Sequence, residues 1–323
     1  MFTLRFAMRS TTSDPDLRAS LYAAAVDMCA WAETRGALAA VMSQHHGVDD
    51  GYLPSPLPVA AAVAARTTSL PITVAALLLA HYEPIKLAED LAVIDLLSRG
   101  RVSYVIGIGY RQEEFDLFGV DRTTRASLVE ARIGTLRGLL AGERVDVEGR
   151  SARIRPLPFT PGGPLLAYGG GTEAAARRAG RLGMLFLAES EDHTLEAAYA
   201  DEAARVGVDA PGCVFPTPGI PLTVFVSDDP ERAWDEIGEY LLVDAMGYGA
   251  WNADRPGTAS ISQATSVAEL HAERGAYQIL TPDEARDLVA RGAPLALQPL
   301  AGGVPPDLAW PYLEAASAVV AGG

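Results

Sequence analysis

The sequence is poor in several features, and each shortage excludes a class of protein. It has only two cysteines, Cys29 and Cys213, far apart and without metal-ligand spacing, so we expect reduced thiols rather than a disulfide framework. Its 26 basic residues are outnumbered by 41 acidic ones, and the net charge of −15 would repel nucleic-acid phosphates. No apolar run reaches the roughly 18 residues of a membrane span. We therefore expect a soluble, cytoplasmic protein with neither a nucleic-acid nor a membrane partner.

Hydrophobic residues make up 49% of the chain and fall in short runs that predict strands. These runs alternate with helical patterns that begin at capping residues, such as Asp14 before Pro15, and end at glycines. The predicted strands are residues 2–8, 38–42, 72–79, 102–108, 165–168, 184–187, 222–226 and 294–300. Strand–helix units in strict alternation predict an α/β fold, a single (β/α)8 TIM barrel over residues 1–323.

Two stretches break this alternation. Residues 143–164 contain a predicted hairpin that turns at Glu148–Gly149. Residues 247–280 fit neither element type well, so we expect an insertion or a lid before the eighth strand.

A barrel of this kind carries its chemistry at the carboxyl ends of its strands. His45 and His46, two of only five histidines, follow the second predicted strand and are the candidate catalytic residues. His81 follows the third strand and is interpreted as part of the pocket wall. A metal centre built from these histidines is disfavoured, because the later strands end without a further His or Asp pair.

Glycines mark the ends of the fourth and fifth strands. The fifth strand leads into a run in which small residues and a helix start favour an anion such as phosphate, with a tight turn that binds no ligand as the alternative: Tyr168, Gly169, Gly170, Gly171 and Thr172. Gly107 and Gly109 either receive a flat ring against the backbone or only relieve crowding. Arg125 could bind a ligand phosphate or pair with a surface carboxylate.

Several of these segments together resemble the bacterial luciferase-like flavin-dependent monooxygenases. The most specific are AARTTSLPITVAALLLAHYEP and LAEDLAVIDLLSRGR, joined by the histidine pair and by GGGTEAAARRAGRLG. The resemblance covers nearly the whole chain and implies a (β/α)8 barrel. It implies an oxidoreductase that uses reduced FMN and oxygen on a small apolar organic substrate, with a separate flavin reductase as partner. It further implies a homodimer.

The resemblance also assigns roles to particular residues. His45 and His46 match the two histidines of the family's Glu-His-His motif, with Gln44 in place of the acid. Ala75 and Ala76 fall where the family has a non-prolyl cis peptide under the flavin ring. The resemblance thus places His45 as proton donor or base beside the flavin.

The resemblance also indicates which residues would bind the flavin phosphate. Gly170, Gly171 and Thr172 fall at the family's phosphate loop. Ile108 stands where the luciferases have a phosphate-binding arginine, and Arg111 or Arg125 could replace it. Gly107 stands where luciferase has a reactive cysteine, so light emission is not implied.

Two other functions remain open at this point. One is a hydride-transferring oxidoreductase of the same fold that uses the deazaflavin coenzyme. The other is a flavin-binding barrel without catalysis, which the departures at Gln44 and Ile108 keep in consideration.

Overall fold

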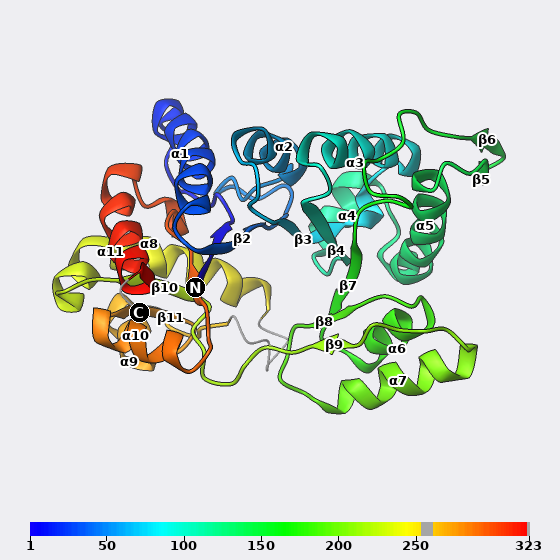
Figure 1. Ribbon diagram of the computed structural model, residues 1–323. Coiled ribbons are helices and arrows are strands. Elements are labelled where there is room, and N and C mark those ends of the chain that lie inside the picture. The colour runs from blue at the N-terminus through cyan, green and yellow to red at the C-terminus, as the bar shows by residue number, and fades with distance from the viewer. Residues whose placement is uncertain (253–260, 322–323) are drawn as a thin grey trace.

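The centre of the molecule is one sheet of parallel strands with helices around it (Figure 1). The computed structural model describes residues 1–252 and 261–321. The strands of this sheet are β1 (Phe2–Phe6), β2 (Ala37–Met42), β3 (Ile72–Leu78), β4 (Val102–Gly107), β7 (Leu166–Gly170), β8 (Phe186–Ala188), β9 (Cys213–Val214), β10 (Thr223–Val226), β11 (Tyr277–Leu280) and β12 (Leu295–Leu297). Their spatial order is β11-β10-β12-β1-β2-β3-β4-β7-β8-β9.

The predicted (β/α)8 barrel is confirmed, and each of the eight predicted strands is present within a few residues of its expected bounds. Two further strands, β9 and β11, were not predicted. They are the end strands of the hydrogen-bonded order, so hydrogen bonds among the described residues do not close the ring. β9 has only two residues, and β11 lies in the stretch that the sequence assigned to an insertion.

The helices begin where the sequence provides caps. The Asp14 side chain accepts a hydrogen bond from the backbone N–H of Asp16, and Thr281 and Glu284 form the predicted capping box. The helices are α1 (Pro15–Glu33), α2 (Pro56–Arg66), α3 (Pro84–Ser98), α4 (Gln112–Phe118), α5 (Arg125–Leu140), α6 (Glu173–Arg181), α7 (Thr194–Val206), α8 (Pro230–Trp251), α9 (Val267–Glu273), α10 (Pro282–Ala290) and α11 (Pro306–Ala321). None of the helices described here is long and apolar enough to cross a membrane.

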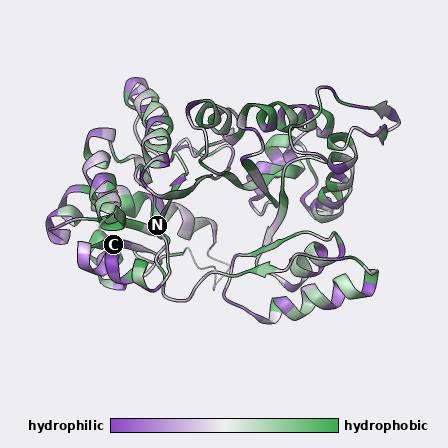
Figure 2. Cartoon of the chain, viewed as in Figure 1, coloured by the Kyte–Doolittle hydropathy of each residue, from purple (hydrophilic) through white to green (hydrophobic). Residues whose placement is uncertain are grey.

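The core lies between the strands and the helices. Alternate residues of β1, namely Phe2, Leu4 and Phe6, are buried, while the residues between them keep some exposure. Tyr104 of β4 is on the buried face, and the carboxylates of α3 act on its hydroxyl, so this face is the one that the helices cover. Helices α2 and α3 are largely hydrophobic along their length (Figure 2). Burial of the strands between two layers of apolar side chains is the main stabilising contribution.

The structure contains the predicted hairpin. Strands β5 (Val145–Val147) and β6 (Arg150–Ala152) pair antiparallel within residues 143–164. The segment that follows is held to the barrel because buried Asp95 accepts a hydrogen bond from the backbone N–H of Thr160 at 2.6 Å.

The predicted insertion at residues 247–280 needs correction in part. Its first residues continue α8 as far as Trp251, and its last four form β11 within the main sheet. Of the described residues between them, 267–273 form α9, a second helix before β11. Residues 253–260 of this predicted lid lie outside the described residues, and the lid role stays a prediction.

Candidate active site

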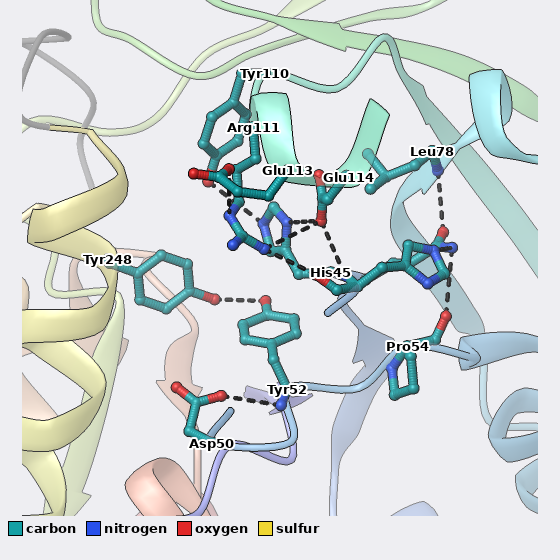
Figure 3. A network of polar contacts seen from close by, with 12 residues as sticks. His45, Asp50, Tyr52, Pro54, Leu78, Tyr110, Arg111, Glu113, Glu114 and Tyr248 are labelled. Carbon is teal, nitrogen blue, oxygen red and sulfur yellow. Dashed lines mark hydrogen bonds and ion pairs between the residues drawn. The ribbon is translucent and has the colours of Figure 1, made fainter. Parts of the chain in front are cut away.

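The carboxyl ends of β2, β3 and β4 bring a histidine and a buried carboxylate together (Figure 3). The His45 Nδ1–H donates to Glu114 Oε1 at 2.8 Å, and the backbone N–H of His46 donates to the same oxygen at 2.8 Å. Glu114 lies on α4 and is fully buried. Arg111, which precedes α4, places Nη1 3.5 Å from the same oxygen. A carboxylate surrounded by three donors stays ionised although it is buried.

Charge and burial set the protonation of this pair. Burial lowers the pKa of His45 and outweighs the opposing effect of Glu114, while Arg111 and Arg9 lower that pKa further. Burial raises the pKa of Glu114, but the hydrogen bond from His45 and the other donors bring it below its usual range. The resting pair is therefore a neutral imidazole and a carboxylate. With its proton on Nδ1, His45 presents a lone pair at Nε2.

Aromatic rings enclose His45. The ring centroids of Tyr52, Tyr110 and Trp251 lie 4.9, 5.5 and 4.6 Å from that of the imidazole. The Tyr110 hydroxyl lies 3.3 Å from His45 Nε2. Tyr52 instead bonds through its hydroxyl to Tyr248 of α8 at 2.6 Å, so α8 closes one side of the site (Figure 3).

His46 has a different environment from His45. Both follow the end of β2, so the chain has left strand geometry and the two rings need not point to opposite sides. Gln44 Oε1 accepts from the backbone N–H of Leu78 at 3.0 Å, which turns Gln44 Nε2 toward His46 Nε2 at 2.7 Å and toward the Tyr82 hydroxyl at 2.9 Å. Because the amide nitrogen only donates, His46 Nε2 accepts and its proton lies on Nδ1. Burial lowers the pKa of His46 as well.

Ala76 of β3 and Gly107 of β4 lie side by side near the carboxyl ends of their strands. The Ala75–Ala76 peptide is cis, as the resemblance implies. Gly107 of β4 lies against it, since a Cβ at Gly107 would stand 2.8 Å from the Ala76 Cβ. Gly109 has a φ of +75° and lies close to the ring of Phe115. Both glycines therefore relieve crowding.

The glycine run from Tyr168 to Thr172 has the predicted strand-to-helix geometry. Gly169 and Gly170 are the last two residues of β7. Thr172 caps α6, because its side chain accepts a hydrogen bond from the backbone N–H of Ala175. A Cβ at Gly170 would stand 2.6 Å from the Ala175 Cβ, so only glycine fits there. Glu189 flanks Gly171 on one side.

Three arginines, Arg122, Arg125 and Arg178, lie near one another and near Tyr168, the first residue of this run. Arg125 begins α5, and its Nη1 donates to the Arg122 backbone carbonyl at 2.7 Å. Burial lowers the pKa of Arg125, and the charges of Arg122 and Arg178 lower it further, while Tyr168 raises it. The Nε atoms of Arg122 and Arg125 are buried without a hydrogen-bond partner. Arg125 forms no ion pair with the carboxylates described here, so a surface salt bridge does not account for it.

Arg111, the other candidate for a phosphate ligand, already contacts His46, Glu114 and Trp251. It donates to the His46 carbonyl at 3.0 Å, and its guanidinium lies 4.5 Å from the Trp251 ring centroid. A groove of about 480 Å³ beside it is lined by Thr11, Gly47, Val48, Asp49 and Asp50.

His81 lies in the wall of the site, as the sequence predicts. It stacks on Phe118 at 4.8 Å and meets the edge of Phe115 at 5.0 Å. Both ring nitrogens are buried without a hydrogen-bond partner, and burial lowers the pKa of His81 to about 4. Among the described residues, no group of three His, Cys, Asp or Glu side chains could hold a metal ion.

The sequence analysis missed the most important partner of His45. No helix was predicted directly after the fourth strand, whereas α4 forms there and buries Glu114. The signal was present: Phe115 and Phe118 recur at helical spacing, and Gly119 ends the helix in the left-handed region. Arg9 was also missed. It is buried, ion-pairs with Asp50 and Asp244, and lies 4.4 Å from the Trp251 ring, which holds the end of α8 over His45.

Fold and site together define an α/β barrel with a buried acid–base pair and a glycine-rich loop at the carboxyl ends of its strands. Residues 5–293 match the family model of the luciferase-like monooxygenases, so the chain belongs to this family. The family consists of flavin-dependent enzymes.

Curated relatives match over shorter stretches. The chain is 31% identical over 142 residues to the uncharacterized protein y4vJ of Sinorhizobium fredii. This match covers 44% of this chain and 40% of that one. It is 26% identical over 125 residues to the alkanal monooxygenase alpha chain of Photorhabdus laumondii, which covers 37% of this chain and 35% of that one. The matches thus span less than half the length of these relatives.

Solved structures match over nearly the whole chain and establish the fold. The monooxygenase RslO1 of Streptomyces bottropensis superposes with a TM-score of 0.72 at 20% identity, covering 100% of this chain and 99% of that one. The oxygenating constituent of 3,6-diketocamphane monooxygenase from Pseudomonas putida, solved in complex with FMN, gives a TM-score of 0.69 at 18% identity, covering 100% and 98%.

Proposed function

We propose that this chain is a flavin-dependent monooxygenase that uses reduced FMN and oxygen to oxidise a small apolar organic molecule. The observation that carries the proposal is the meeting of two features at one edge of the barrel. Ala76 and Gly107 lie in close contact between β3 and β4, and the His45–Glu114 pair stands at the carboxyl ends of β2 and β4. A planar ring and a positioned base are the two requirements of this chemistry.

The chain's own residues fit FMN at both ends. Ala75, Ala76 and Gly107 would hold the planar ring system, in the position that the family resemblance implies. The glycine run and Arg125, whose buried Nε lacks a partner, suit the phosphate. Bound reduced flavin would supply the electrons that activate oxygen.

The protein's contribution is position, protonation and exclusion of water. His45, neutral and polarised by Glu114, would act as the base. Trp251 and Tyr52 cover the imidazole and keep solvent from it. The apolar residues at the end of β3 suit an apolar substrate.

The partners also belong to the proposal. The sequence has no glycine-rich dinucleotide fingerprint of its own, which favours a separate reductase as the source of reduced FMN. A homodimer is supported by the outer face of α3, where Val93, Leu96 and Leu97 are exposed. We place the enzyme in the cytoplasm.

An anaerobic titration with reduced FMN and with reduced deazaflavin, followed by admission of air, tests the proposal. We expect tight binding of reduced FMN and oxygen uptake that is faster than with free flavin. Preference for the deazaflavin without oxygen uptake would move the assignment to a hydride-transfer oxidoreductase. Binding of neither would leave a barrel without flavin chemistry.

A further inference from the structure

His45 is poorly placed to touch a substrate itself. Only 8% of the residue is exposed, and the rings of Tyr52, Tyr110 and Trp251 surround it. Its Nδ1–H is committed to Glu114. The remaining nitrogen, Nε2, faces the Tyr110 hydroxyl at 3.3 Å. A base enclosed in this way needs another group to reach the reacting atoms.

Tyr110 is better placed for that contact. It is only half-buried and lies three residues after Gly107, where β4 contacts Ala76 of β3. We propose that Tyr110 is the group through which His45 exchanges a proton with the reacting atoms, an inference that rests on the proposed monooxygenase function. The family resemblance assigns no role to this position.

The resting protonation gives the relay its direction. A proton leaves the substrate or oxygen species for the Tyr110 oxygen, while the Tyr110 proton moves to His45 Nε2. One bond to hydrogen breaks and one forms at the phenol oxygen, and no electrons are transferred. The imidazolium that results is stabilised by the Glu114 carboxylate. The reverse transfer returns Tyr110 and His45 to their starting state.

Burial and two nearby cations favour the neutral form of His45, so its Nε2 can accept a hydrogen bond and a proton. Arg111 at the start of α4 and Arg9, three residues after β1, both oppose protonation of His45, and Glu114 favours it. The neighbouring Tyr52 and Tyr248 are bonded to each other. His46, the other titratable neighbour, directs its Nε2 to Gln44. Of these groups, Tyr110 has the only hydroxyl that the described contacts place on His45 Nε2.

The test compares Tyr110→Phe with Tyr52→Phe. Each removes one hydroxyl from a ring that packs on His45, but only Tyr110 bonds to the imidazole. In the flavin-free protein, 15N NMR of the histidine side chains should show the Nε2 signal of His45 moving toward that of an unbonded nitrogen in Tyr110→Phe and not in Tyr52→Phe. The His45 pKa should also rise, because the donor that favours the neutral imidazole is lost.

Turnover with reduced FMN gives a second measurement. Tyr110→Phe should lower kcat by about 10- to 100-fold, with little change in flavin affinity. Unchanged His45 signals in Tyr110→Phe, or an equal fall of kcat in the two variants, would overturn the relay. Absence of turnover in the wild-type protein would instead contradict the proposed function, and the NMR measurement would still test whether Tyr110 donates to His45.

Discussion

The two halves of the candidate site differ in whether their buried polar groups already have hydrogen-bond partners. In the half around His45, the polar groups are buried and already bonded to one another, from Glu114 through His45 to Tyr110. In the half around the glycine run, Arg122 and Arg125 keep buried nitrogens without partners. The first half is preorganised for proton transfer, and the second has donors available for a ligand. Changes in the first should therefore alter chemistry, and changes in the second should alter affinity.

The largest effect is expected for His45→Ala. Loss of the base should lower kcat by at least about 100-fold while the dissociation constant of FMN changes only a few-fold. Steady-state turnover and an anaerobic flavin titration measure the two separately. His271→Ala, which removes a histidine of α9 that stacks on Trp234, is the control. Unchanged turnover in His45→Ala would remove His45 from the mechanism.

The matching change in the other half is Arg125→Met. It should weaken FMN binding by about 10-fold, because a charge-assisted hydrogen bond to phosphate is lost, and should leave riboflavin binding unchanged. Titrations with both flavins give the comparison. Arg144→Met removes the same charge from an exposed site before the hairpin and is the control. Equal losses for FMN and riboflavin would show that Arg125 does not bind the phosphate.

His81 provides a test on stability. Its folded-state pKa of about 4 lies below the ordinary value of 6.5, so the unfolded chain binds the proton more tightly. Stability is therefore present above about pH 6.5 and is lost as the pH falls toward 4. At pH 5 the loss attributable to His81 is about 1–2 kcal/mol. His81→Phe keeps a ring against Phe115 and Phe118 and should be less sensitive to acid in urea unfolding at pH 5 and pH 7.5. The same loss in both proteins would contradict this account.

The smallest effect concerns Gln44. In Gln44→Glu, a carboxylate replaces the amide that donates to His46 Nε2, so the pKa of His46 should rise above its wild-type value. NMR titration of the histidines measures this directly. Gln112→Glu makes the same change in charge at an exposed residue of α4 and should leave His46 unchanged. An unaltered His46 titration in Gln44→Glu would mean that the amide does not fix its tautomer.

The two halves also differ in how far the sequence could predict them. The glycine run is contiguous, so its strand–turn–helix shape could be predicted from five adjacent residues. The His45–Glu114 contact joins residues 69 positions apart, and it exists only because α4 folds back across the strand ends. Local patterns do not encode such a contact. Because the enclosing rings belong to distant elements, the burial that lowers the pKa of His45 was also invisible in the sequence.

The barrel itself was predictable because strands buried on both faces read as apolar runs, as in β3. The strands that escaped prediction, β9 and β11, are short and are the ends of the sheet. There, pairing with one neighbouring strand rather than the local sequence defines the element.

A crystal structure of the complex with FMN would test the central claim most directly. We expect the ring to lie on Ala75–Ala76 and Gly107, within reach of Tyr110, and the phosphate to contact the glycine run and Arg125. A phosphate bound instead in the groove beside Asp50 and Arg111, or a ring placed away from the cis peptide, would contradict this expectation.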